Sequence, residues 1–329
     1  AYEIAQCLVG TEMCIRDRYG RLVNVVAQYG SATNQETLIV PKPCMIIASA
    51  DHGVADMGVS AYPKETTVGM TQNYLIPKGA GANSLANYCG AQMEVIDMGI
   101  DADMSWVPGL RSHKLGMGTK NFVEEPAMTR EQAIEGIEAG IRLVKEKIDE
   151  GFNVFLVGEM GISNTTASAL MTAKFAGLTA EEATGRGTNI SDERLKLKQR
   201  IVHDVLEKYK DIPKDDAIGI LSSVGGFEFA CIVGVILGAA ANNGLVIIDG
   251  FNTSACALVA KTLVPEVMDY VMASHLSAEK AAKSSLENLG LEAYVDLGLC
   301  LGEASGSSVQ MGMLDLAVHM YLAITGGKA

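Results

Sequence analysis

Two acidic residues stand in glycine-rich turns where they could remove a proton or hold a substrate. Glu303 lies in LGEASG, in an apolar neighbourhood whose desolvation would raise the pKa of its carboxyl group and make it a usable base near neutral pH. An ordinary acid at a helix N-terminus explains Glu303 equally well when it is taken alone. Glu159 follows an apolar run and lies in the turn GEMG, a position that favours a functional role.

The chain around Glu159 also predicts an anion site. The run from Val154 leads into a turn that ends at Gly161, and Asn164-Thr165-Thr166 then opens a helix of small residues. Glycines let the backbone approach a ligand closely, a helix N-terminus presents free N–H groups, and hydroxyl groups add donors. The alternative is an ordinary strand-to-helix turn with an Asn or Thr cap.

Two further glycine turns repeat this arrangement. Gly185-Arg186-Gly187-Thr188 precedes the helix that bears Lys198, and Gly225-Gly226 follows a predicted strand. Neither turn fits the phosphate loop GxxxxGK[ST] or the dinucleotide pattern GxGxxG, so we expect neither a nucleoside triphosphate nor NAD. A lysine on a polar helix face is ordinarily solvated. Lys198 is nevertheless the one candidate point charge near Glu159 and could pair with a phosphate or orient that carboxylate.

Asp249 and two histidines complete the candidates. Asp249 ends the apolar run VIIDG, where a carboxylate could accept hydrogen bonds from ribose hydroxyls or cap the next helix, and the sequence favours neither. His52 and His275 could bind a metal with Asp51 only if folding brought the three together, and no supporting pattern of neighbours is present. We therefore predict no metal, and histidines that are structural or that hydrogen-bond a substrate.

The elements that must position these residues follow an α/β pattern. Short apolar runs, each followed by a helical pattern, predict buried parallel strands at Cys44 to Ser49, Val154 to Val157, Ala217 to Leu221 and Leu245 to Ile248, with a weaker strand at Met93 to Met98. Long helical patterns occupy Arg130 to Glu150, Asp192 to Tyr209 and Phe229 to Asn242. The sequence therefore predicts a Rossmann-like, doubly wound parallel sheet, in which ligands bind where the carboxyl ends of the strands converge.

The same patterns divide the chain into unequal parts. We expect residues 44–306 to form the parallel α/β domain, and residues 19–43 with 307–329 to form a smaller helical subdomain, because both end segments have helical patterns. Between Asp101 and Pro126 the helical period fails, which predicts a lid or a surface excursion. Residues 1–18 carry no fold argument, since Gly10 to Arg18 reads as a translated sequencing-library adapter rather than as native protein.

Composition excludes several classes of protein. The net charge of −13 over 329 residues lacks the basic footprint of a nucleic-acid binder. The apolar runs are broken well before the roughly 18 to 20 residues that a membrane-spanning helix needs. The seven cysteines show no metal-ligand spacing, which favours reduced thiols in a cytoplasmic protein, and no targeting segment is evident.

Taken in order, eight blocks resemble the nicotinate-nucleotide:dimethylbenzimidazole phosphoribosyltransferase family. They extend from about Gly20 to the end of the chain and read ADHGV at residue 50, GVSAYP at 58, GEMGISNTT at 158, GRGT at 185, VGGFE at 224, DGF at 249, SHLSAE at 274 and LGEASG at 301. The family transfers phosphoribose from nicotinate mononucleotide to the lower-ligand base of cobamides. The resemblance implies a homodimer with a Rossmann-like sheet, a small helical domain, no catalytic metal and no cofactor.

The same resemblance assigns roles to individual residues. Glu303 would be the general base that removes the imidazole proton while the other ring nitrogen attacks ribose C1, which inverts that carbon. Glu159 and Lys198 would lie in the nucleotide and base pocket, with the glycine turns around phosphate and ribose. The matching blocks add further substrate-binding candidates, namely Ser60, Tyr62, Pro63, Ser274, His275, Ser305 and Gly306.

This chain departs from the family pattern in two places. The KPPGSLG-like N-terminal segment is missing, which puts activity in doubt. The family often has Gln in a VTxQM context that lines the base pocket, whereas this chain has Gly69 there. We predict that the preferred base differs from dimethylbenzimidazole and is a purine, another benzimidazole or a phenol. Two rival functions are a hydrolase that gives the ribosyl group to water and a nucleotide-binding regulator without turnover.

Overall fold

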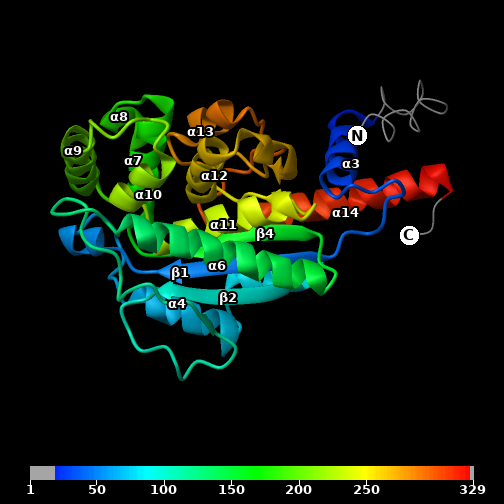
Figure 1. Ribbon diagram of the computed structural model, residues 1–329, viewed down its shortest axis with the longest axis horizontal. Helices are drawn as coiled ribbons and strands as arrows, with labels where there is room; N and C mark the ends of the chain where they lie inside the picture. The colour runs from blue at the N-terminus through cyan, green and yellow to red at the C-terminus, as the bar shows by residue number, and fades with distance from the viewer. Residues whose placement is uncertain (1–18, 327–329) are drawn as a thin grey trace.

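The computed structural model describes residues 19–326 and contains a six-stranded, all-parallel sheet (Figure 1). The strands are β1 (Pro43–Ala50), β2 (Gln92–Gly99), β3 (Arg111–Ser112), β4 (Val154–Met160), β5 (Leu245–Ile247) and β6 (Val271–Met272). Their order is β3-β2-β1-β4-β5-β6, so the direction of winding reverses between β1 and β4. The predicted doubly wound, Rossmann-like sheet is confirmed.

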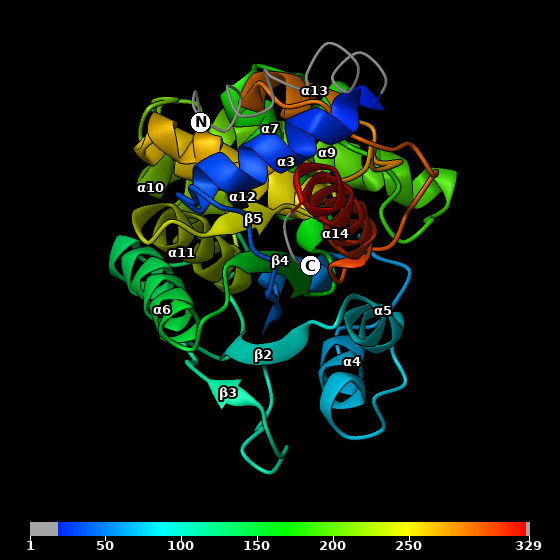
Figure 2. The same ribbon diagram turned by 90° about the vertical axis from the view of Figure 1, so that its right-hand side faces the viewer.

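Helices cover both faces of this sheet, as Figure 2 shows for α6 and α11 on one side and α4, α5 and α14 on the other. The first face carries α6 (Arg130–Asp149), α7 (Asn164–Ala176), α8 (Ala180–Ala183), α9 (Asp192–Lys208), α10 (Ala217–Val224), α11 (Phe227–Ala241), α12 (Phe251–Leu263) and α13 (Ala282–Leu289). The second face carries α3 (Arg21–Ala32), α4 (Thr66–Leu75), α5 (Gly81–Cys89) and α14 (Ser305–Thr325). Short 3₁₀ helices η2 (Gly53–Met57) and η3 (Pro265–Tyr270) join these elements.

Strand β1 shows why its sequence is apolar at almost every position. Cys44, Ile46 and Ala48 point into the core beneath α11, whereas Met45 and Ile47 point into the core beneath α14. Successive side chains of a strand face opposite sides, and both sides of a doubly wound sheet are covered. The central strands therefore read as continuous apolar runs, which is the pattern from which they were predicted.

One predicted strand is wrong. Residues 217–221 begin helix α10, whose N-terminus is capped by Asp216, because the Asp216 carboxylate accepts the Gly219 N–H at 2.9 Å. The helix is buried by packing against α6, α7 and α12. A short apolar run that is buried all round has no periodicity to distinguish a helix from a strand. The long segment from Asp101 to Pro126 also differs from a plain loop, since it supplies the edge strand β3.

The two end helices α3 and α14 pack against each other on the same side of the sheet (Figures 1 and 2). Helix α14 also contacts α5, β4 and β5, and thus reaches from the chain end to the centre of the sheet. The separate small subdomain of residues 19–43 and 307–329 stays a prediction. The suspect residues 1–18 and residues 327–329 lie outside the described part of the chain.

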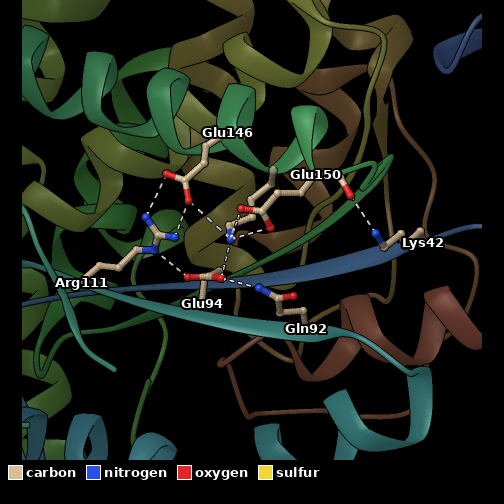
Figure 3. Close-up of polar contacts among 7 residues, drawn as sticks. Lys42, Gln92, Glu94, Arg111, Glu146 and Glu150 are labelled. Carbon is tan, nitrogen blue, oxygen red and sulfur yellow. Dashed lines mark hydrogen bonds and ion pairs between the residues drawn. The ribbon is translucent and has the colours of Figure 1, made fainter. Parts of the chain in front are cut away.

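A network of charged side chains connects β2, β3 and α6 near the N-terminal end of β2 (Figure 3). The Lys147 ammonium of α6 lies 2.8 Å from Glu94 of β2 and 3.0 Å from Glu150, and Arg111 of β3 lies 2.7 Å from Glu94. Arg111 also pairs with Glu146. Burial alone would raise the pKa of Glu94, but Lys147 and Arg111 together hold that pKa below its ordinary value. The network ties β3 and α6 to β2.

Candidate active site

A pocket of about 440 Å³ opens beyond the carboxyl ends of β4 and β5. It lies beside the point where the winding of the sheet reverses, where doubly wound sheets bind ligands. Of the predicted residues, the structure places nine in its walls: Tyr62, Glu159, Gly161, Asn164, Thr165, Gly187, Thr188, Asp249 and Glu303. These residues come from five separate segments, which the sheet brings to one end.

Glu159 is held in place by a chain of side-chain amides. It lies inside the end of β4, one residue before the strand terminates, rather than in the turn that was predicted to follow a shorter strand. The Asn164 amide donates to the Glu159 carboxylate, the Asn252 amide donates to Asn164 at 3.0 Å, and the Ser168 hydroxyl donates to Asn252 at 2.7 Å. Burial raises the pKa of Glu159 to about 7, although the two asparagines oppose the shift.

Glu303 stands directly before helix α14, with its side chain buried at the pocket wall. Both Glu303 and the next residue, Ala304, adopt the left-handed backbone region, with φ of 60° and 61°. Burial raises the pKa of the Glu303 carboxyl group, and interaction with the Tyr74 hydroxyl of α4 lowers it in part. Glu303 is therefore a stronger base than a solvated glutamate, as a general base near neutral pH needs to be.

Glycines allow these two carboxylates to share the pocket. A Cβ on Gly158 would lie 2.6 Å from the Ala304 nitrogen, and one on Gly302 would lie 2.5 Å from the Glu159 Oε1 atom. A side chain at either position would push the Glu303 segment away from β4. The close approach of β4 to the residues before α14 thus depends on both glycines.

Lys198 lies outside the pocket wall, behind Thr165, and its side chain is buried rather than solvated. Its relative exposure is 1%, and its ammonium donates to the Thr165 hydroxyl at 2.8 Å. Burial lowers the pKa of Lys198 to about 8, while the negative charge of Glu279 opposes that shift. A buried lysine that makes this one hydrogen bond beside an open pocket can accept an anion such as a phosphate.

The turn Gly185–Thr188 closes the pocket next to Lys198. The Gly187 N–H donates to the Glu279 carboxylate at 2.7 Å, and the second Glu279 oxygen lies against Gly185. The Thr188 hydroxyl accepts the Ala61 N–H at 3.0 Å and lies 3.2 Å from the Ser60 hydroxyl. Glu279 and Thr188 thus fix the turn from both sides.

Asp249 lies two residues beyond β5 and faces the first turn of α14. One of its carboxylate oxygens accepts the Gly306 N–H at 2.6 Å and the Ser307 N–H at 3.0 Å. Burial raises the pKa of Asp249 to about 7, and these N–H groups oppose the shift. Asp249 therefore caps α14 and not the next helix, α12, as the sequence suggested; because it also lines the pocket, the ribose contact stays a prediction.

Ser274, His275, Ser305 and Gly306 surround this cap and lie outside the pocket wall. The Ser274 hydroxyl donates to the Asp249 carbonyl at 2.8 Å, and the His275 ring fills the space beside Gly306. The Ser305 hydroxyl donates to the Leu301 carbonyl at 2.8 Å. These residues support the segment that carries Glu303.

Gly225 and Gly226 also lie away from the pocket wall, and the segment before them is α10 rather than a strand. Gly226 packs on a fully buried pair in which the His52 imidazole contacts the Glu228 carboxylate at 2.6 Å. Burial alone would lower the pKa of His52, but Glu228 raises it overall. Within residues 19–326, no group of three or more His, Cys, Asp or Glu side chains is arranged to hold a metal.

Pro63 and Gly69 stand at the entrance to helix α4 and on its exposed side. Thr66 and Met70 of the same helix line the pocket, together with Tyr62 one turn earlier. Gly69 itself is not part of the wall, and a Cβ there would meet no atom within 4 Å. A longer side chain at residue 69 therefore has room at the pocket edge.

Several wall residues were not predicted. The most consequential are Glu279, Asn252 and Met70, joined by Tyr74 behind Glu303. Glu279 lies in the block SHLSAE, and Asn252 directly follows the DGF block, so one stood within and the other beside a segment already marked as functional. Met70 and Tyr74 could have been found from their spacing of four residues on a helix that follows Tyr62.

Comparison with known proteins places the chain in a family. Residues 15–326 match the model of a family described as Phosphoribosyltransferase. A protein of Geobacter sulfurreducens named nicotinate-nucleotide–dimethylbenzimidazole phosphoribosyltransferase is 43% identical over 301 residues, which cover 92% of this chain and 85% of the relative. A protein of the same name from Chloroflexus aggregans is 41% identical, with coverage of 91% and 84%.

Solved structures agree with the sequence comparison. The crystal structure of CobT from Thermus thermophilus superposes with a TM-score of 0.89 at 33% identity and covers 95% of this chain and 94% of that one. The chain therefore belongs to the phosphoribosyltransferase family that these relatives represent. The resemblance inferred from the eight sequence blocks is confirmed.

Proposed function

We propose that this protein transfers phosphoribose from nicotinate mononucleotide to a lower-ligand base, which gives an α-ribazole-type phosphate and nicotinate for cobamide biosynthesis. The observation that carries the proposal is that one pocket has a buried carboxylate, Glu303, in its wall and a buried cation, Lys198, directly behind its wall residue Thr165. The names of the relatives support the identity of both substrates.

The chemistry that we infer needs one proton transfer. Glu303 removes the N–H proton of the acceptor ring, and the opposite ring nitrogen attacks C1 of the ribose. The new C1–N bond forms as the bond from C1 to the nicotinate nitrogen breaks, and nicotinate leaves with the electron pair. Attack from the face opposite the leaving group inverts C1. Raised basicity of Glu303 favours the proton transfer.

Positioning supplies the rest of the rate enhancement. Lys198 would hold the donor phosphate together with the Thr165 hydroxyl at the start of α7. The Glu159 carboxyl group, with a pKa near 7, would face the reacting ribose and stabilise its developing positive charge when it is ionised. Two reactants that the protein holds in the correct relative geometry react as though they were parts of one molecule.

The proposal is tested by incubating the protein with nicotinate mononucleotide and a panel of bases, with nicotinate and nucleotide products followed by chromatography and mass spectrometry. We expect release that requires a base and falls at least about 100-fold in Glu303→Gln. Glu266→Gln is the matched control, because Glu266 is exposed on η3 away from the pocket. Release without any base would indicate a hydrolase, and binding without release in the native protein would indicate a regulator.

We further propose that the protein is a cytoplasmic homodimer. Support comes from exposed apolar side chains on α5 and α14: Tyr88 is 81% exposed and Leu316 is 60% exposed. The Tyr88 ring lies near Gly312, one turn before Leu316, since a Cβ built on Gly312 would be 3.6 Å from it. The five cysteines within residues 19–326 are free thiols, as suits a reducing compartment. The part of the chain that the structure describes has no helix long and apolar enough to span a membrane. Sedimentation velocity of Leu316→Glu tests the interface, and an unchanged dimer would contradict it.

A further inference from the structure

The segment that carries Glu303 has a backbone that it would not adopt unaided. Two consecutive residues with side chains, Glu303 and Ala304, lie in the left-handed region directly before α14. That region is disfavoured for residues with a Cβ, and such conformations persist only where the surroundings determine them. The conformation matters because it sets the direction in which the Glu303 carboxyl group points.

The Asp249 carboxylate is the group that fixes the start of α14. It accepts the Gly306 N–H at 2.6 Å and the Ser307 N–H at 3.0 Å, three and four residues after Glu303. Asp249 is itself immobilised, because its N–H donates to the Thr253 hydroxyl at 2.8 Å and its carbonyl accepts the Ser274 hydroxyl at 2.8 Å. The segment after β5 is thereby connected to the first turn of α14.

Close packing on both sides restricts the position of the start of α14. The His275 ring occupies the space where a side chain of Gly306 would stand, and Gly158 of β4 touches the backbone of Glu303 and Ala304. The Ser307 and Ser308 hydroxyls donate back to the Ala304 carbonyl at 3.0 and 2.7 Å. A loss of the Asp249 contacts would remove the carboxyl oxygen that accepts two N–H groups of this turn.

We propose that Asp249 is a positioning residue, whose hydrogen bonds to the first turn of α14 hold Glu303 in the left-handed conformation that points its carboxyl group at the acceptor. The proposal rests on the function proposed above, in which Glu303 is the base. This role differs from the ribose contact that the sequence suggested for Asp249, because a ribose ligand would act on the donor substrate and a positioning residue acts through Glu303.

A double-mutant cycle tests this inference. The kcat and the KM for nicotinate mononucleotide are measured for Asp249→Ala, Asp249→Asn, Glu303→Gln and the Asp249→Ala/Glu303→Gln double variant. We expect kcat of Asp249→Ala to fall about 100-fold, the scale of a misplaced catalytic group, with the donor KM changed by less than about threefold. The double variant should be no slower than Glu303→Gln alone, because the anchor has no base left to position.

Asp249→Asn tests whether kcat recovers, relative to Asp249→Ala, when an acceptor oxygen is kept at residue 249. Asparagine keeps an oxygen that can accept both N–H groups but loses the charge, so kcat should recover to within about tenfold of the native value. If Asp249→Ala fails to fold, the cycle is run with this variant. The matched control is Asp216→Ala, which removes the aspartate cap of α10, whose carboxylate accepts the Gly219 N–H at 2.9 Å. It should lower the melting temperature without lowering kcat.

Two results would overturn the inference, and they are distinguishable from a failure of the proposed function. A rise in donor KM that matches the loss in kcat/KM would make Asp249 a ribose ligand. A further loss of kcat when Asp249→Ala is added to Glu303→Gln would show that Asp249 does not act through the base. If Glu303→Gln itself keeps native kcat, the base assignment fails and the positioning role fails with it.

Discussion

Gly302 lies against Glu159 so closely that a methyl group on its Cα would approach the Glu159 Oε1 atom to 2.5 Å. Because Gly302 immediately precedes Glu303, this contact sets the separation of the two carboxylates. We predict that Gly302→Ala lowers kcat at least about tenfold, since displacement of a catalytic group by even 1 Å is costly. Gly312→Ala on α14 is the control, because its Cβ would meet Tyr88 at an ordinary 3.6 Å. Equal activity of both variants would refute the steric argument.

The raised pKa of Glu159 predicts a dependence of stability on pH. Its pKa is about 7 in the folded protein, against an ordinary 4.5, so ionisation of this group opposes folding above pH 7, and the penalty disappears as the pH falls from 7 to 4.5. We expect Glu159→Gln to raise the free energy of unfolding by up to about 3 kcal/mol at pH 8 and by about 1 kcal/mol or less at pH 5. Urea unfolding at the two pH values measures this. A gain of the same size at both would show that charge is not the cause.

The lowered pKa of Lys198 predicts that donor binding weakens at alkaline pH. Lys198 is protonated below about pH 8 and loses its charge above it, so its attraction for the donor phosphate falls in that range. The KM for nicotinate mononucleotide should rise through pH 8 in the native enzyme, and Lys198→Met should show a high KM with no such rise. A native KM that stays constant from pH 7 to 9.5 would exclude Lys198 as a phosphate ligand.

Glu279 should influence both Lys198 and the turn over the pocket, and two substitutions separate these effects. Glu279→Gln keeps an acceptor for the Gly187 N–H but removes the charge that raises the pKa of Lys198. The alkaline rise in donor KM should therefore begin below pH 8 in this variant. Glu279→Ala also frees the turn, and its donor KM should be higher than that of Glu279→Gln at pH 7. An unmoved pH midpoint in Glu279→Gln would show that the two charges are not coupled.

The sheet could be predicted from sequence because each central strand is buried on both faces and reads as an unbroken apolar run. The same reasoning failed for residues 217–221, where an all-round buried helix gives the identical pattern. Glu303 and Glu159 stood out as acids among glycines, and Gly158 and Gly302 are positions where a Cβ would collide with the neighbouring segment. Individual candidate residues could thus be predicted where an acid lay in an unusual, glycine-rich segment.

The geometry of the site could not be predicted, because it depends on contacts between distant segments. Lys198 lies on a polar helix face, and only the packing of α9 against α7 and α8 shows that this lysine is buried beside Thr165. The contacts of Asp249 with the N–H groups of Gly306 and Ser307, more than fifty residues later in the chain, were not among the roles that the sequence suggested for it. Periodicity indicates which face of a helix is polar, but not what covers that face.

Gly69 leads to a prediction about the acceptor base. It lies on the exposed side of α4 between Thr66 and Met70, which both line the pocket, and a Cβ built on it would meet no atom within 4 Å. A glutamine at residue 69 would fill part of that space and add a hydrogen-bonding group, so the native glycine should admit bases that a glutamine would exclude. We expect the native protein to prefer a purine, another benzimidazole or a phenol over dimethylbenzimidazole, and Gly69→Gln to shift the ratio of kcat/KM values toward dimethylbenzimidazole by about tenfold. Competition among equal concentrations of these bases, with the products separated by mass, measures both ratios.

Gly69→Ala is the control for loss of glycine alone. A native enzyme that already uses dimethylbenzimidazole almost exclusively would show that the other wall residues, and not the missing side chain, set the choice of base.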